Sequence, residues 1–141
     1  MTTKPTLYID PVGTLLIDGE HPNHFLEATV SPYAAPFMAW ATKHFNVRWL
    51  TEQGPARMFH LAECLGLPGH TVPYASFVDA KSDGIRNPHT SFWVDTHLTP
   101  TDVSWIQQHG VADRFLSVAG DAGITEGHKE WLADKIKTKR R

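Results

Sequence analysis

Four short apolar runs recur along the chain, at residues 7–10, 47–50, 91–95 and 114–118. Each has the length of a buried strand, and the first and third end in an aspartate. Apolar residues in the segments between them recur every three or four positions, which is the spacing of an amphipathic helix. Strands that alternate with helices predict a mostly parallel sheet covered by helices on both faces.

Capping residues and helix breakers indicate where the helices begin and end. Ser31 followed by Pro32 is typical of a helix start, and Thr99 and Thr125 are expected to cap two later helices. Gly66 is expected to end the second helix. The four predicted helices lie at residues 31–45, 58–66, 99–109 and 125–136.

A short β-hairpin is expected directly after the first strand. Residues 15–17 and 25–30 have strand-like composition, and a polar loop that contains His21 and His24 joins them. Residues 70–78 are ambiguous, because Pro73 interrupts a stretch that would otherwise suit a further strand. The predicted fold class is therefore α/β, a three-layer Rossmann-like arrangement with a hairpin flap after the first strand.

Composition sets the frame but does not identify a function. The chain has 141 residues, which predicts a single domain over 1–141, with 41% hydrophobic and 20% charged residues. A net charge of −2 gives no overall attraction to nucleic acid or membrane surfaces. The only cysteine, Cys64, excludes an internal disulfide and is expected to fill a small space in the core. No apolar run is long enough to span a membrane and no signal peptide is recognisable, so we expect a cytoplasmic protein.

Polar side chains stand where three of the predicted strands end. Asp10 and Asp95 close the first and third apolar runs, and Thr51 follows the second. In a doubly wound sheet, the carboxyl ends of neighbouring strands meet at one crevice. Lys81 precedes Asp95 by a loop and could reach the same crevice. The sequence therefore predicts one site built from two carboxylates, a hydroxyl and an ammonium group.

The stretch Leu7-Tyr8-Ile9-Asp10-Pro11-Val12-Gly13-Thr14-Leu15 resembles the first motif of the haloacid dehalogenase (HAD) superfamily, strand-Asp-x-Asp-Gly-Thr/Val. Nearly the whole chain is similar to the small capless HAD proteins that include the HAD domain of the Swiss Army Knife RNA-repair group. The shared features are Trp-Leu-Thr at 49–51, Leu-Gly-Leu-Pro at 65–68, Trp-Val-Asp at 93–95 and Gly-Ile-Thr at 123–125.

This resemblance implies a HAD-like fold without a large cap domain, and a role for each site residue. Asp10 would be the nucleophile that takes up a phosphoryl group, and Thr51 would donate a hydrogen bond to that group. Lys81 would balance its charge. Asp10, the carbonyl of Val12 and Asp95 would hold Mg²⁺, which prefers oxygen ligands. The implied activity is phosphate-ester hydrolysis through an aspartyl-phosphate.

Two residues depart from the family pattern. Val12 stands where the family has its second aspartate, so the carbonyl ligand remains but the general-acid carboxylate is lost. General acid–base assistance is typically worth about 10²–10⁴-fold in rate. Thr96 stands where the most similar proteins have another acidic residue after Asp95, and this change weakens the metal site or its surroundings.

Three interpretations remain open. In the main one the chain is a phosphohydrolase, weak or altered, in which His21, His24 or His97 replaces the missing acid, because histidine titrates near neutral pH. In the second it is an inactive binding or regulatory protein on a HAD scaffold. In the third it is a HAD enzyme of another chemistry, such as a dehalogenase, although no arginine marks a halide site. An uncapped crevice would favour a large phosphorylated substrate such as a nucleic-acid end.

Overall fold

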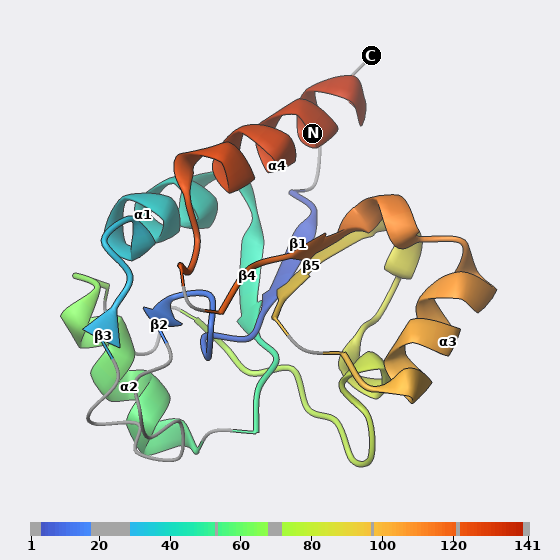
Figure 1. Cartoon of the computed structure of the whole chain (residues 1–141), viewed down its shortest axis with the longest axis horizontal. Helices are drawn as coiled ribbons and strands as arrows, with labels where there is room; N and C mark the ends of the chain where they lie inside the picture. Colours follow the sequence, from blue (N-terminus) through green and yellow to red (C-terminus); the bar gives the residue numbers. More distant parts are fainter. Residues whose placement is uncertain are drawn as a thin grey trace.

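The structure, a computed structural model, describes residues 4–17, 29–52, 54–67, 72–96, 98–120 and 122–139. Within these ranges, four strands form one parallel sheet in the order β4-β1-β5-β6 (Figure 1). They are β1 (Thr6–Ile9), β4 (Asn46–Trp49), β5 (Ser91–Asp95) and β6 (Phe115–Ser117). The predicted α/β class and the mostly parallel sheet are therefore confirmed.

Two further strands, β2 (Leu16–Ile17) and β3 (Thr29–Val30), form the antiparallel hairpin expected after β1. The loop between them, with His21 and His24, lies outside the described residues, as does His97. The ambiguous region near Pro73 forms no regular strand in its described part. It contributes a single bridge, between Tyr74 and Trp49, beside the end of β4.

The helices are close to their predicted positions. They are α1 (Ala34–His44), α2 (Pro55–Cys64), α3 (Pro100–His109) and α4 (Glu126–Lys139). In the described ranges, three short 3-10 turns accompany them, η3 (Lys81–Gly84), η4 (Pro88–Thr90) and η5 (Ala112–Arg114). Within the described ranges, no helix is long and apolar enough to cross a lipid bilayer.

Alternating side chains of the strands build two hydrophobic clusters, one on each face of the sheet. Leu7 and Ile9 of β1 pack with buried residues of α1, α2 and α4. Tyr8, which points the other way, packs with Trp93 of β5 and Ile106 of α3. Figure 1 shows α3 on the opposite side of the sheet from α1 and α4. These clusters give three layers and fix the strand ends that carry the site.

Two sequence predictions about individual residues are wrong. Ser31 does not cap α1, because the helix starts at Ala34 and the Ser31 hydroxyl donates a hydrogen bond to the carbonyl of Ile124 (3.3 Å). Cys64 is exposed on α2 rather than buried, and its Sγ lies 3.7 Å from Nε2 of His60. In both cases a tertiary contact or the orientation of a helix decides the outcome, which a local pattern does not reveal.

Candidate active site

The carboxyl ends of three neighbouring strands bring the predicted polar residues to one edge of the sheet. Because β1 lies between β4 and β5, Asp10 lies between the strand ends that lead to Thr51 and to Asp95. All three residues are buried, with exposed fractions of 8% for Asp10, 6% for Thr51 and 1% for Asp95. Buried carboxylates need partners, because taking an unpaired charge out of water is costly.

Lys81 supplies that partner. Its Nζ donates hydrogen bonds to Oδ2 of Asp10 and to Oδ2 of Asp95, the latter at 2.9 Å. The ammonium group therefore bridges two carboxylates that come from different strands. The prediction that Lys81 reaches the crevice is confirmed, although its segment has no regular pattern of apolar residues.

A buried carboxylate that the sequence analysis did not single out holds the Lys81 turn in place. Asp102 of α3 accepts a hydrogen bond from the backbone N–H of Ser82 (3.1 Å) through Oδ1. Its Oδ2 accepts from the Thr99 hydroxyl (2.9 Å) and from the Thr99 backbone N–H (3.4 Å). The Asp102 N–H in turn donates to the Thr99 hydroxyl oxygen (3.2 Å), so the two backbone bonds form a capping box at the start of α3. Thr-Pro-x-Asp at 99–102 signals the capping box in the sequence, but nothing there signals the contact with η3.

The turn after β1 is fixed by its own hydrogen bonds. Oδ1 of Asp10 accepts from the Val12 N–H (3.1 Å), and the hydroxyl of the fully buried Thr14 donates to the Asp10 carbonyl. Gly13 has φ +84, and a Cβ at this position would lie 2.4 Å from Oγ1 of Thr96. Glycine is therefore required at position 13, by its positive φ and by its close packing against Thr96 just after β5.

Thr96 connects the two departures from the family pattern. Its backbone N–H donates to Oδ1 of Asp95 (2.6 Å), and its hydroxyl lies 3.4 Å from the Val12 carbonyl, to which it donates a long hydrogen bond. That carbonyl is the third oxygen of the predicted metal site. The Thr96 hydroxyl thus occupies one lone pair of the Val12 carbonyl oxygen, the oxygen that the resemblance assigns to Mg²⁺.

The charges at this edge of the sheet are strongly coupled. Burial raises the pKa of Asp95 and the nearby Asp10 charge raises it further, while Lys81 and the Thr96 N–H oppose the increase. Burial lowers the pKa of Lys81, but both carboxylates and their hydrogen bonds outweigh burial, so this pKa lies above its ordinary value. Lys81 therefore remains charged at neutral pH, and the pair of carboxylates still favours additional positive charge.

Asp10, Asp95 and the Val12 carbonyl offer two carboxylates and one neutral oxygen. Mg²⁺ commonly takes one or two carboxylates, completes its octahedral shell with water and accepts only hard oxygen ligands, so this donor set fits it. Among the described residues, no group of three or more His, Cys, Asp or Glu side chains could hold a metal ion. Any metal at this edge therefore has to rely on the backbone carbonyl and on water.

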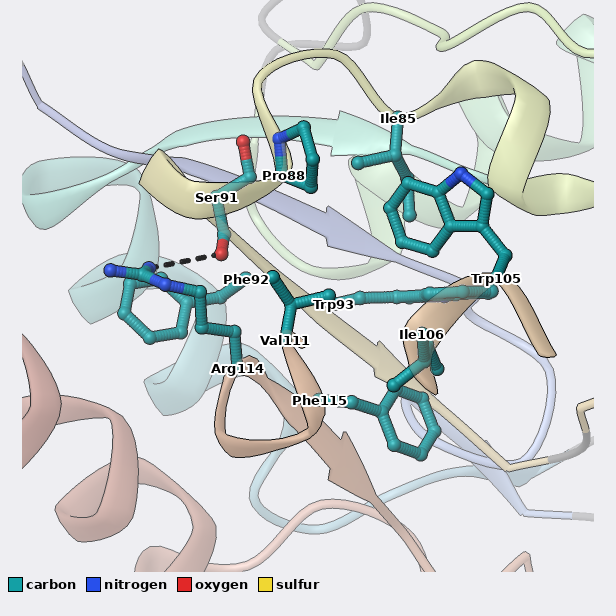
Figure 2. Close-up of a pocket in the computed structure, with 10 residues that line it drawn as sticks. All are labelled: Ile85, Pro88, Ser91, Phe92, Trp93, Trp105, Ile106, Val111, Arg114 and Phe115. Carbon is teal, nitrogen blue, oxygen red and sulfur yellow. Dashed lines mark hydrogen bonds between the residues drawn. The ribbon is translucent and has the colours of Figure 1, made fainter. Parts of the chain in front are cut away.

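A small apolar cavity lies behind the site, on the face covered by α3 (Figure 2). Trp93 lines it, and the Nε1 of this indole donates to Oδ2 of Asp95 (3.3 Å). Arg114 closes one side, with its guanidinium 4.6 Å from the Phe92 ring centroid and bonded to the Ser91 carbonyl (3.1 Å). The cavity volume of about 10 Å³ holds at most one water, so it is no substrate pocket.

Trp49 and Trp93 lie near the ends of β4 and β5, and both are buried in the core, so neither offers an open surface on which a nucleic-acid base could stack.

Comparison of the chain with protein-family models, curated proteins and solved structures finds no match. The relation to the HAD superfamily therefore stays a prediction that rests on the residues themselves.

Proposed function

We propose that the chain is a HAD-like, Mg²⁺-dependent phosphohydrolase that acts through an aspartyl-phosphate on Asp10. One observation carries this proposal: a half-buried ammonium group, that of Lys81, bridges two buried carboxylates at the carboxyl ends of adjacent parallel strands. A carboxylate repels a phosphate dianion, so a phosphoryl-transfer site needs positive charge beside its nucleophile. In a parallel α/β sheet, this edge is also where ligands bind.

In the proposed first step, an Oδ atom of Asp10 attacks phosphorus, and the bond between phosphorus and the ester oxygen breaks. Lys81 neutralises charge on the phosphoryl oxygens, and the Thr51 hydroxyl at the adjacent strand end donates to one of them. Bound through Asp10, Asp95 and the Val12 carbonyl, Mg²⁺ would supply Lewis-acid stabilisation of the phosphoryl charge. In the second step water attacks phosphorus, the acyl-phosphate bond breaks, and inorganic phosphate leaves with Asp10 restored.

Val12 determines how efficient such an enzyme can be. The leaving alkoxide needs a proton in the first step, and the attacking water must lose one in the second. A valine side chain can neither donate nor accept a proton. The loss corresponds to about 10²–10⁴-fold in rate, or roughly 3–5 kcal/mol of barrier. An aryl phosphate avoids the first difficulty, because a phenolate leaves without protonation. An alkyl phosphate or a nucleic-acid end does not, so we expect slow turnover on such substrates.

A second function, a non-catalytic protein that binds phosphorylated ligands, is favoured by the contact between Thr96 and the Val12 carbonyl. The hydroxyl lies 3.4 Å from that oxygen, so the metal site is weakened in the same turn that has lost its acid. Asp95 and Lys81 would still bind a metal or a phosphoryl group in such a protein. A dehalogenase-type enzyme would turn over without a metal, and EDTA distinguishes it.

The test is phosphate release with Mg²⁺ or EDTA, from an aryl phosphate and from a 3′-phosphorylated oligonucleotide. Wild type, Asp10→Asn and Val12→Asp are compared. The proposal predicts slow release by wild type, none by Asp10→Asn, and a gain in Val12→Asp that is larger on the oligonucleotide. If none of the three proteins releases phosphate, the result favours the second function, a non-catalytic protein that binds phosphorylated ligands. Release that Asp10→Asn leaves unchanged contradicts the proposal.

A further inference from the structure

Within the described residues, one half of a sheet face is not covered by a helix. α3 packs through Ile106 over Trp93 and Phe115, on the β5 and β6 side of the second face. The β1 and β4 side of that face carries Thr6, Asn46 and Arg48, which the register pairs as Thr6 with Asn46 and Tyr8 with Arg48. Asn46 and Arg48 are exposed. Tyr8 on this half-face is buried, so the exposed part is the polar strip along β4. Parallel sheets usually bury both faces, so this exposed strip indicates a surface with another use.

Two adjacent cavities follow this half-face. One has a volume of about 380 Å³ and is lined in part by Tyr8, Tyr74 and Arg86. The other, of about 270 Å³, lies nearer the start of the chain. Thr6 and Arg48 line both cavities, so the two lie next to each other beside β1 and β4. Each part approaches the size of a small-ligand site.

The charge of this groove differs in sign from that of the whole chain. Its described lining includes Lys4, Arg48 and Arg86 and no aspartate or glutamate, although the chain has a net charge of −2. None of these three cations forms an ion pair with another described residue, in contrast to Lys81. We call this surface, defined by Lys4, Arg48, Tyr74 and Arg86, the basic groove.

Hydrogen bonds fix the backbone on one side of the basic groove. The Arg86 N–H donates to the hydroxyl of Tyr8 (3.0 Å), and the Ser91 hydroxyl donates to the Arg86 carbonyl (3.1 Å). Gly84 packs so closely that a Cβ would lie 3.0 Å from both the Ser76 carbonyl oxygen and Leu50. Arg86 is therefore presented from a rigid turn, which lowers the entropic cost of binding an anion.

We propose that the basic groove binds single-stranded nucleic acid. Two adjacent cavities that share an arginine in their linings suit a chain that carries one phosphate per unit better than they suit a single small anion. Arg48 would contact the phosphate between two nucleotides, Lys4 and Arg86 the flanking phosphates, and the half-buried Tyr74 would stack on a base. This inference does not depend on phosphoryl transfer at Asp10.

The test is fluorescence anisotropy of a labelled single-stranded 12-mer across a salt series. For single strands the slope of log K against log salt is about −0.7 per phosphate contacted, so three cations predict a slope of roughly −2. Arg48→Gln and Arg86→Gln should each reduce the slope by about 0.7 and weaken binding about fivefold at 0.1 M salt. Arg57→Gln, an exposed arginine on α2 that lines neither cavity, should change neither value.

Stacking is tested separately with Tyr74. Tyr74→Leu should weaken binding by roughly 5- to 150-fold, and Tyr74→Phe should restore it, because the phenyl ring keeps the stacking face. No binding at low salt would overturn the proposal, as would an effect of Arg57→Gln equal to that of Arg48→Gln. Equal or tighter binding of the matching duplex, or competition by inorganic phosphate at the oligonucleotide's phosphate concentration, would overturn the single-strand assignment. Asp10→Asn should bind as wild type does.

Discussion

Replacing Lys81 by methionine tests whether the ammonium group holds the two carboxylates together. Methionine keeps most of the aliphatic length but removes the charge, so Asp10 and Asp95 would face each other at the strand ends without a cation. The gross attraction between Lys81 and Asp95 at 2.9 Å is about 6 kcal/mol at an effective dielectric constant of about 20. Desolvation of the ammonium group offsets part of that attraction.

Removing one partner of a buried ion pair typically costs about 3–5 kcal/mol. A chain of 141 residues has an unfolding entropy of about 0.3 kcal/mol per kelvin, so Lys81→Met should lower Tm by roughly 10–17 °C at pH 7. Without Lys81 the folded-state pKa of Asp95 would rise further, so the loss of stability should shrink as the pH falls toward 4.

The assay is thermal unfolding followed by circular dichroism between pH 4 and pH 8, with and without Mg²⁺. Lys43→Met, which removes an exposed lysine from α1, is the matched control and should change Tm little. Mg²⁺ should raise the Tm of Lys81→Met more than that of wild type, because the cation would replace the missing charge. A Tm within about 3 °C of wild type, or a loss independent of pH, would refute the reasoning.

Three further predictions concern the elements around the site. Gly13→Ala should destabilise the fold by about 2 kcal/mol or more, because φ is +84 and the Cβ meets Thr96, and Thr96→Ala should reduce that cost in a double-mutant cycle. Thr99→Ala should cost about 0.5–2 kcal/mol in denaturant unfolding, because it removes the cap of α3 and frees Asp102. Wild type should lose stability as pH rises above 10.5, because the raised pKa of Lys81 stabilises the fold only while the amine is protonated, and Lys81→Met should lack this alkaline step.

The sequence predicted the main elements because their patterns are local. Residues 91–95 form β5 with the predicted bounds, and Thr99 caps α3 as expected. Asp10, Thr51 and Asp95 could be placed at one edge because parallel strands end on the same side of a sheet. Predicting that a residue lies at a strand end requires no knowledge of contacts between distant segments.

What the sequence could not predict depends on contacts between distant segments. Asp102 looks like an ordinary capping residue, and its bond to Ser82 exists only because α3 packs beside η3. The basic groove was also missed, since Lys4, Arg48 and Arg86 are widely separated in the sequence. Scattered cations on a chain of net negative charge give no local signal.

The central claim is that Asp10 takes up a phosphoryl group, and intact-mass spectrometry tests it most directly. Because Val12 cannot activate water, the second step should be slow and the aspartyl-phosphate should accumulate on wild type incubated with an aryl phosphate and Mg²⁺. We predict a mass increase of one phosphoryl group, which maps to Asp10 and is absent in Asp10→Asn. In Val12→Asp it should be short-lived, because the restored carboxylate would assist hydrolysis. An unmodified wild type that still releases phosphate, or a phosphoryl group on another residue, would contradict the account.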